Sequence, residues 1–138
     1  MASKLVHVSG KRKRSIARAT LKEGKGVITI NSVSLPIFMP RYSRMRIEEA
    51  MQLAKDFVDV GTLDISVTAT GGGVFGQADA IASAIARGLL EWTGSDELRE
   101  AYHNHDRTLI AGDHRLTEPH KPGQSSKGPR HKRQKSYR

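Results

Sequence analysis

The sequence contains no cysteine, and this absence excludes two ways of holding a small protein together. There can be no disulfide framework and no zinc site with thiolate ligands. Long apolar runs are also missing, since none approaches the roughly 18 residues that a membrane-spanning helix needs. The first ten residues, MASKLVHVSG, lack the apolar stretch of a secretory signal. We therefore expect a soluble, intracellular protein.

Aromatic side chains are scarce, with three Phe, three Tyr and a single Trp among 138 residues. They do not alternate with the basic runs, as the aromatic residues of a stacking platform for single-stranded nucleic acid do. Trp92 follows Leu89 and Leu90 in an apolar stretch. We therefore expect its ring to pack inside the protein.

Acidic residues are nearly absent from both ends of the chain. Residues 1–46 hold 11 Lys and Arg against the single acid Glu23, and residues 119–138 hold seven Lys and Arg and no acid. Residues 47–118 hold five Lys and Arg against 13 acids, and the formal net charge of the chain is +9. A surface that only keeps a protein soluble mixes the two signs. The segregation predicts one basic face and a partner that is an acidic polymer or surface.

The length indicates one domain with an extension, which we divide into a body (1–113) and a tail (114–138). After Leu116 the tail has no aliphatic residue, so burial cannot offset an ordering cost of about 1–2 kcal/mol per residue. We predict that the tail is disordered alone and acquires a shape only against a polyanion, through phosphate contacts that salt weakens. A solubilising or localisation tail is the alternative.

Hydrophobic periodicity predicts an α+β body. Alternation predicts strands at 5–9, 15–21, 27–30 and 63–70, and helical spacing predicts helices at 44–61, 77–92 and 95–102. The order β-β-β-α-β-α, with all helices on one face of the sheet, is a two-layer sandwich.

Turn residues set the expected limits of these elements. The stretch KEGKG (22–26) predicts a hairpin between the second and third strands, and residues 10–14 read as a basic loop. Ser43 is a candidate cap for the first helix, which Gly61 should end, and Ser95 is a candidate cap for the last.

Four consecutive cations, KRKR, stand in the basic loop. Like charges at this density repel each other unless a polyanion neutralises them. We interpret the run as a nucleic-acid contact, with a solvated hairpin loop as the alternative. The residues assigned to it are Lys11, Arg12, Lys13 and Arg14, joined by Arg18 and Arg44 from the same half of the chain.

A glycine-rich stretch, GGGVFGQ (71–77), joins the last strand to the long helix. Glycines at such a junction let the backbone approach a phosphate, and the first turn of the helix offers free N–H groups. No Lys-Ser/Thr pair follows, so the stretch is no nucleotide-binding P-loop. Gly71, Gly72, Gly73 and Gln77 are candidate RNA contacts, and a plain strand-to-helix turn is the alternative.

Histidines offer the one enzymatic alternative, a metal nuclease built from His103, His105, Asp113 and His114. The HxxxH and HExxH spacings of helical metal sites are both absent. A free DNA-compacting or regulatory protein with a basic arm is a further alternative. We expect neither catalysis nor a metal or other cofactor.

The stretch GGGVFGQADAIASAIARGL (71–89) closely resembles the signature of the small-subunit ribosomal protein nine family, including Arg87. The opening GKRKRSIARATLKEGKGVITIN (10–31) looks like that family's first hairpin. The ending TEPHKPGQSSKGPRHKRQKSYR (117–138) is similar to the archaeal and eukaryotic form of its tail.

This resemblance implies a cytoplasmic, non-enzymatic protein of the small ribosomal subunit whose body contains a rare left-handed βαβ crossover. The body would lie on ribosomal RNA in the head of the subunit, next to other head proteins. The tail would thread through RNA to the peptidyl-site tRNA and touch its anticodon stem-loop with Lys135 and Arg138. The tail residues that would bind ribosomal RNA are Lys121, Lys127, Arg130, Lys132 and Arg133.

Overall fold

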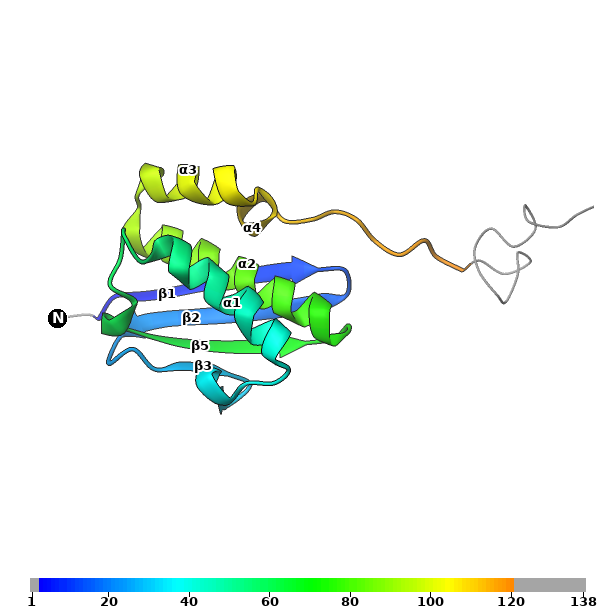
Figure 1. The fold of residues 1–138 in the computed structure, drawn as a ribbon, viewed down its shortest axis with the longest axis horizontal. Helices are drawn as coiled ribbons and strands as arrows, with labels where there is room; N and C mark the ends of the chain where they lie inside the picture. Colours follow the sequence, from blue (N-terminus) through cyan, green and yellow to red (C-terminus); the bar gives the residue numbers. More distant parts are fainter. Residues whose placement is uncertain (1–2, 121–138) are drawn as a thin grey trace, which may run out of the picture.

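A computed structural model describes residues 3–120, and in it a five-stranded mixed sheet is covered on one face by helices (Figure 1). The α+β two-layer architecture predicted from periodicity is confirmed. The strands are β1 (Leu5–Arg12), β2 (Ser15–Glu23), β3 (Ile28–Ile30), β4 (Val33–Ser34) and β5 (Leu63–Thr70). The helices are α1 (Arg41–Ala54), α2 (Val74–Thr93), α3 (Asp96–His105) and α4 (Thr108–Ala111), with 3-10 turns η1 (Leu35–Ile37) and η2 (Val60–Thr62).

The strand order in the sheet is β1-β2-β5-β3-β4. β5 pairs antiparallel with β2 and parallel with β3, so Ile65 lies between Leu21 and Ile28. The predicted hairpin between the second and third strands is therefore wrong. The intervening segment instead passes over the start of β5, where the Asp64 carboxylate accepts hydrogen bonds from the backbone N–H groups of Lys25 and Val27.

The connection from β3 through α1 to β5 is a left-handed crossover. In Figure 1, β5 runs from left to right above β3, which is parallel to it, and α1 returns in front of the sheet. With both strands pointing right, the chain passes from β3 to the strand above it through a helix on the viewer's side of the sheet, and this path is left-handed. About 98% of such connections are right-handed. The topology implied by the family resemblance is thus present.

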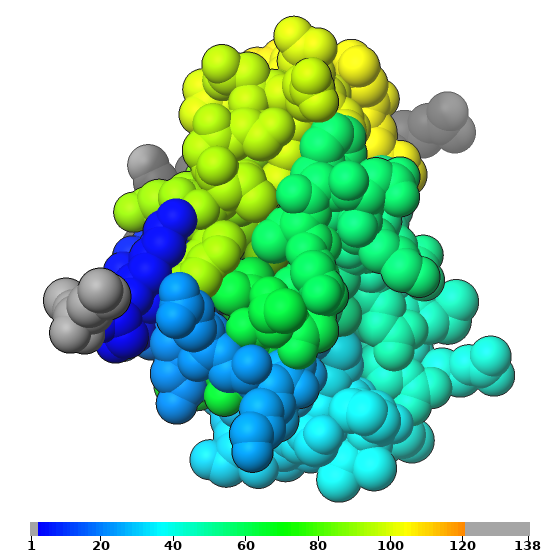
Figure 2. Space-filling view, turned by 90° about the vertical axis from the view of Figure 1, so that its left-hand side faces the viewer, coloured from blue at the N-terminus to red at the C-terminus, as the bar shows by residue number. Residues whose placement is uncertain are grey.

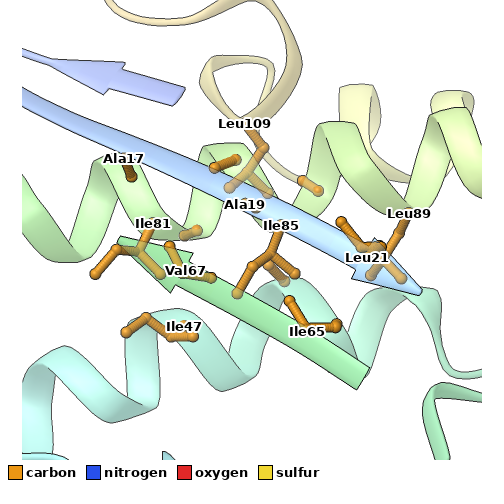
Figure 3. Close-up of a cluster of buried hydrophobic side chains, with 14 of the residues drawn as sticks. Ala17, Ala19, Leu21, Ile47, Ile65, Val67, Ile81, Ile85, Leu89 and Leu109 are labelled. Atoms are coloured by element: carbon orange, nitrogen blue, oxygen red, sulfur yellow. The ribbon is translucent and has the colours of Figure 1, made fainter. Parts of the chain in front are cut away.

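The core lies between the covered face of the sheet and α2 (Figure 3). Every second residue of β2 from Ser15 to Leu21, and of β5 from Leu63 to Ala69, is buried, in alternation with residues that face outward. α2 is buried on nearly all sides, because the sheet, α1 and α4 surround it. At Gly88 a Cβ atom would come within 2.5 Å of the Leu21 side chain, so this helix lies closer to β2 than any larger residue would allow.

Helix α1 begins and ends earlier than its sequence pattern predicted. It starts at Arg41 after Pro40, so Ser43 lies inside the first turn, where its hydroxyl is buried without a hydrogen-bond partner in the described chain. It ends at Ala54, and Asp59 caps the following turn η2 by accepting from Gly61 N at 2.9 Å. The predicted cap at Ser95 is confirmed, since its hydroxyl accepts from Leu98 N.

No helix among residues 3–120 is long and apolar enough to span a bilayer.

Candidate nucleic-acid interface

Several candidate residues meet at one end of the molecule, where the β1–β2 turn, the loop 71–73, the starts of α1 and α2, and the exit of segment 112–120 lie together (Figure 1). We call this region the cationic end, and define it by Lys11, Lys13, Arg14, Arg41 and loop 71–73. Hydrogen bonds connect its parts, since Ser15 Oγ donates to Gly71 O at 3.0 Å. The fold therefore brings together two motifs that are nearly sixty residues apart in sequence.

The basic run is less of a loop than we predicted, because β1 continues to Arg12 and pairs with Ser15. Only Lys13 and Arg14 form the turn, and Lys13 has the unusual positive φ of 52°. Strand alternation then separates the first two cations. Lys11 is exposed on the open face of the sheet, and Arg12 faces the helices with 16% of its side chain accessible.

Arg12 is held by contacts within the protein. Its guanidinium lies 3.3 Å from Asp113 Oδ2 and donates to Arg115 O at 3.2 Å. Asp113 also accepts three hydrogen bonds from the Arg115 guanidinium and one from the Arg115 backbone N–H. These bonds, together with the charges of both arginines, hold the pKa of its carboxyl well below the usual range. This pair of arginines around one carboxylate anchors the root of the tail to the β1–β2 hairpin.

The three consecutive glycines serve different purposes. Gly71 and Gly72 have φ values of 76° and 65°, which L side chains rarely adopt. A Cβ atom at Gly72 would lie 2.1 Å from Ser15 Oγ, so this part of the loop packs against the β1–β2 turn. Gly73 caps α2 with an ordinary φ of −101° and has no atom within 4 Å of a Cβ position. All three glycines are exposed, but only at Gly73 is the space beside the Cα atom open.

Three other predicted contact residues donate hydrogen bonds to backbone carbonyls. Gln77 Nε2 donates to Gly71 O at 3.0 Å and shapes the glycine loop. Arg87 donates to Ile110 O and Ser9 O, which joins α4 to β1 across α2. Arg44 donates to Pro36 O at 2.6 Å and lies 3.7 Å from a Glu48 oxygen.

The uncovered face of the sheet continues the cationic end. Arg18 is exposed there between Ser9 and Thr68, its register partners on β1 and β5. The next row of partners is His7, Thr20 and Ser66. Hydroxyl, imidazole and guanidinium groups on one face can all donate to phosphate oxygens.

An aromatic pair beside Arg41 was missed by the sequence analysis. The rings of Tyr42 and Phe75 meet edge to face with centroids 5.3 Å apart, and both residues are more than 60% exposed. They lie 33 residues apart on the first turns of two helices, so no local pattern could have revealed the pair.

Acids at the cationic end are neutralised by a partly buried network around Arg46. Its guanidinium donates to Asp79, Glu49 and Asp106 at 3.0, 2.6 and 2.8 Å. Burial alone would lower the pKa of Arg46, but the three carboxylates outweigh it and raise that pKa. The pKa values of Glu49 and Asp106 are lowered in turn, because hydrogen bonds from His105, Thr108 and Arg46 outweigh the effect of burial.

The residues of the metal-nuclease alternative are not assembled. His105 pairs with Glu49 and Asp113 is enclosed by two arginines. Within residues 3–120 no three His, Asp or Glu side chains are grouped so that they could hold a metal ion.

The predicted contacts in the tail, from Lys121 to Arg138, lie outside the described residues.

Comparison with known proteins identifies the family. A profile described as "Ribosomal protein S9/S16" matches residues 10–138. The chain is 47% identical to "Small ribosomal subunit protein uS9" of Methanococcus maripaludis strain C7 over 135 residues, which cover 98% of this chain and 99% of the relative. The chain belongs to the ribosomal protein S9/S16 family. The uS9 protein of Methanococcus vannielii is equally similar, at 47% identity over 135 residues.

Membership of the S9/S16 family confirms the resemblance drawn from the glycine signature and from both ends of the sequence. It is a family of ribosomal proteins and not of enzymes, which removes the nuclease alternative. The match also includes residues 121–138, so the tail is part of what the family shares.

Proposed function

We propose that this chain is a structural constituent of the small ribosomal subunit, binding ribosomal RNA in the head through its cationic end and the open face of its sheet. The observation that carries the proposal is the family match over residues 10–138. In the fold, the backbone of Arg14 lies beside Gly71, and the first turn of α1, which begins at Arg41, contacts the first turn of α2. The name of the relatives assigns them to the small subunit. Arg12 already forms a salt bridge with Asp113. We therefore assign it a main role in anchoring the tail and a secondary role in binding RNA.

Electrostatics supports the use of this end. Lys11, Lys13, Arg14 and Arg18 are exposed and make no ion pair with the described part of the chain. Each cation that neutralises a phosphate releases counterions, which favours binding most at low salt and makes the affinity fall as the salt concentration rises. Arg44 and Arg87 hold this surface in shape through hydrogen bonds to backbone carbonyls. The open space beside Gly73 leaves room for a phosphate to approach its backbone.

Sedimentation of cell extracts tests membership of the subunit. We expect the chain to sediment with the small subunit at low salt and to remain there through moderate salt, because many phosphate contacts act together. A protein that distributes over DNA or stays at the top of the gradient would contradict the proposal and favour the free DNA-binding alternative.

We further propose that the tail extends through RNA to the peptidyl-site tRNA, where Arg138 and Lys135 contact the anticodon stem-loop. The support is the family match of the tail and the anchoring of its root by Arg12 and Asp113 at the cationic end. A guanidinium fork binds phosphate oxygens through two parallel hydrogen bonds. The C-terminal carboxylate repels phosphate, so Lys135 is needed to orient the tip.

Deleting Arg138 should speed dissociation of peptidyl-site tRNA by roughly threefold to tenfold, the effect of about 1 kcal/mol. Filter-binding kinetics on purified small subunits that carry the shortened chain measure this rate. Gln134→Ala, an uncharged change in the same tail, serves as the control and should leave the rate unchanged. Equal rates for intact and shortened chains would reject the tRNA role but not the RNA-binding role of the body.

A further inference from the structure

The end of the molecule opposite the cationic end carries an apolar groove of about 600 Å³. Figure 2 looks onto this end, where the loop before β3, the segment 55–62 and the last turns of α1 meet. The floor consists of Ile28, Met51, Val58 and Val60, which are partly buried against the core. Phe57 lines it with 37% of its surface exposed. Apolar side chains that pack against the core are therefore accessible to a binding partner in this groove.

The rim of the groove carries more carboxylates than cations. Glu48, Asp56 and Asp59 line it, Lys55 is the one cation among the lining residues, and Arg44 lies 3.7 Å from a Glu48 oxygen. Asp59 is also held in place, because it caps η2 through Gly61 N. A carboxylate rim repels phosphates and attracts Lys and Arg side chains.

The described chain does not cover this groove. Segment 112–120 leaves the body at the cationic end, on the far side of the sheet and helices (Figure 1). An apolar floor within a polar rim is the usual anatomy of a protein docking site, where an apolar side chain anchors the centre and charges surround it.

We propose that the groove docks a basic segment of another protein of the subunit, with one apolar side chain on the floor and flanking Lys or Arg residues at Glu48 and Asp56. The inference rests on the proposed membership of the small subunit. It assigns opposite partners to the two ends of the body: RNA to the cationic end, and polypeptide to the acidic groove. RNA, a second copy of this chain and its own residues 121–138 are the competing occupants.

Site-specific photocross-linking in assembled subunits identifies the occupant. Gln52 is exposed and lines the groove, so p-benzoylphenylalanine replaces it in the full-length chain. Irradiation of purified small subunits should join it to a different protein, at a peptide that carries Lys or Arg within a few residues of an aliphatic or aromatic side chain. The same photoreactive residue in place of Glu100, exposed on α3, should not form this product.

The competing outcomes overturn the proposal. A cross-link to ribosomal RNA, to a second copy or to residues 121–138 of the same chain would each assign the groove to another occupant. Absence of any product from position 52 would show that the groove is empty. Incorporation into subunits is scored separately by sedimentation of the unlabelled chain, so a failure of the proposed function is distinguishable from a failure of the groove.

Charge reversal supplies a second measurement that does not depend on a bulky substitution. Asp56 is exposed and makes no hydrogen bond or ion pair with the described residues, so Asp56→Lys should leave the fold intact. We expect it to lower the yield of the cross-link at position 52 at least fivefold. Glu100→Lys makes the same charge change away from the groove and should leave the yield unchanged. Equal yields for both variants would contradict recognition by the acidic rim.

Discussion

The adjacent residues Gly72 and Gly73 are glycines for different physical reasons. Gly72 has a positive φ and touches the Ser15 side chain, whereas Gly73 has an extended backbone and open space at its Cβ position. The first is therefore required by the fold, while the second is required only if something approaches from outside. The contrast separates a structural role from a binding role at neighbouring positions.

Replacing each glycine by alanine should separate these roles. Gly72→Ala places a Cβ atom 2.1 Å from Ser15 Oγ at a positive φ, and should lower the free energy of unfolding by about 1–3 kcal/mol. Gly73→Ala should change it by less than about 0.5 kcal/mol. Urea denaturation measures both effects.

The RNA affinity of Gly73→Ala completes this comparison. If a phosphate approaches the backbone there, Kd for a small-subunit RNA transcript should rise about tenfold, as expected for the loss of one charge-assisted hydrogen bond. An unchanged Kd would assign loop 71–73 to the strand-to-helix turn alone.

Elements are joined in this body by few but well-placed polar contacts. Arg46 on α1 connects α2 through Asp79 and the end of α3 through Asp106. Tyr102 on α3 donates its hydroxyl to Ala50 O on α1 at 2.6 Å, away from solvent. These contacts hold α3 against a layer that α1 and α2 already form.

Arg46→Gln should destabilise the protein in a pH-dependent way. The Arg46 side chain is 21% exposed. We therefore expect the substitution to lower the free energy of unfolding by about 1–3 kcal/mol at pH 7, which lies between the costs of breaking an exposed and a buried ion pair. The folded pKa values of Glu49 and Asp106 lie below their unfolded values. Their contribution is therefore present above about pH 4 and is lost as the pH falls through the folded pKa values.

Urea denaturation of both proteins at pH 7 and pH 3 measures this dependence. The difference between the parent chain and Arg46→Gln should be large at pH 7 and smaller at pH 3, because the stabilisation falls once the pH drops below the unfolded pKa values of these carboxylates. A difference that stays constant between the two pH values would show that Arg46 acts through packing of its aliphatic portion.

Across the whole molecule, cations dominate the surface at one end, while the charge at the other end is mixed. Lys13 and Arg14 form the β1–β2 turn and Arg41 starts α1 at the end where the tail leaves, and Asp56, Asp59 and Lys55 line the groove at the other end. A field of this kind orients the protein as it approaches a polyanion, before any specific contact forms. Salt dependence is the direct measure of how many phosphates the cationic end neutralises.

Replacing Lys13 and Arg14 together by Gln should reduce the slope of log K against log salt for a small-subunit RNA transcript by about 1.4–1.8, since each phosphate contact contributes about 0.7–0.9. Lys55→Gln with Arg99→Gln removes the same charge from exposed positions outside the cationic end and should leave the slope nearly unchanged. Equal slopes for the two double variants would show that RNA senses net charge alone.

Periodicity and composition were sufficient to predict much of the secondary structure and the family of this protein. The alternation in 63–70 and the apolar stripe of 77–92 predicted β5 and α2, because burial of one face leaves a regular pattern in sequence. Charge segregation predicted a basic face, and the glycine signature and the tail indicated the family that the comparisons confirmed.

Only the tertiary structure decided which strands are neighbours and which cations remain exposed. The insertion of β5 between β2 and β3 replaced the expected hairpin, since parallel pairing depends on residues nearly forty positions apart. For the same reason Arg12 is paired with Asp113 while Arg14, two residues away, faces solvent. Local patterns record burial and backbone preference, but partners distant in sequence meet only when the chain has folded.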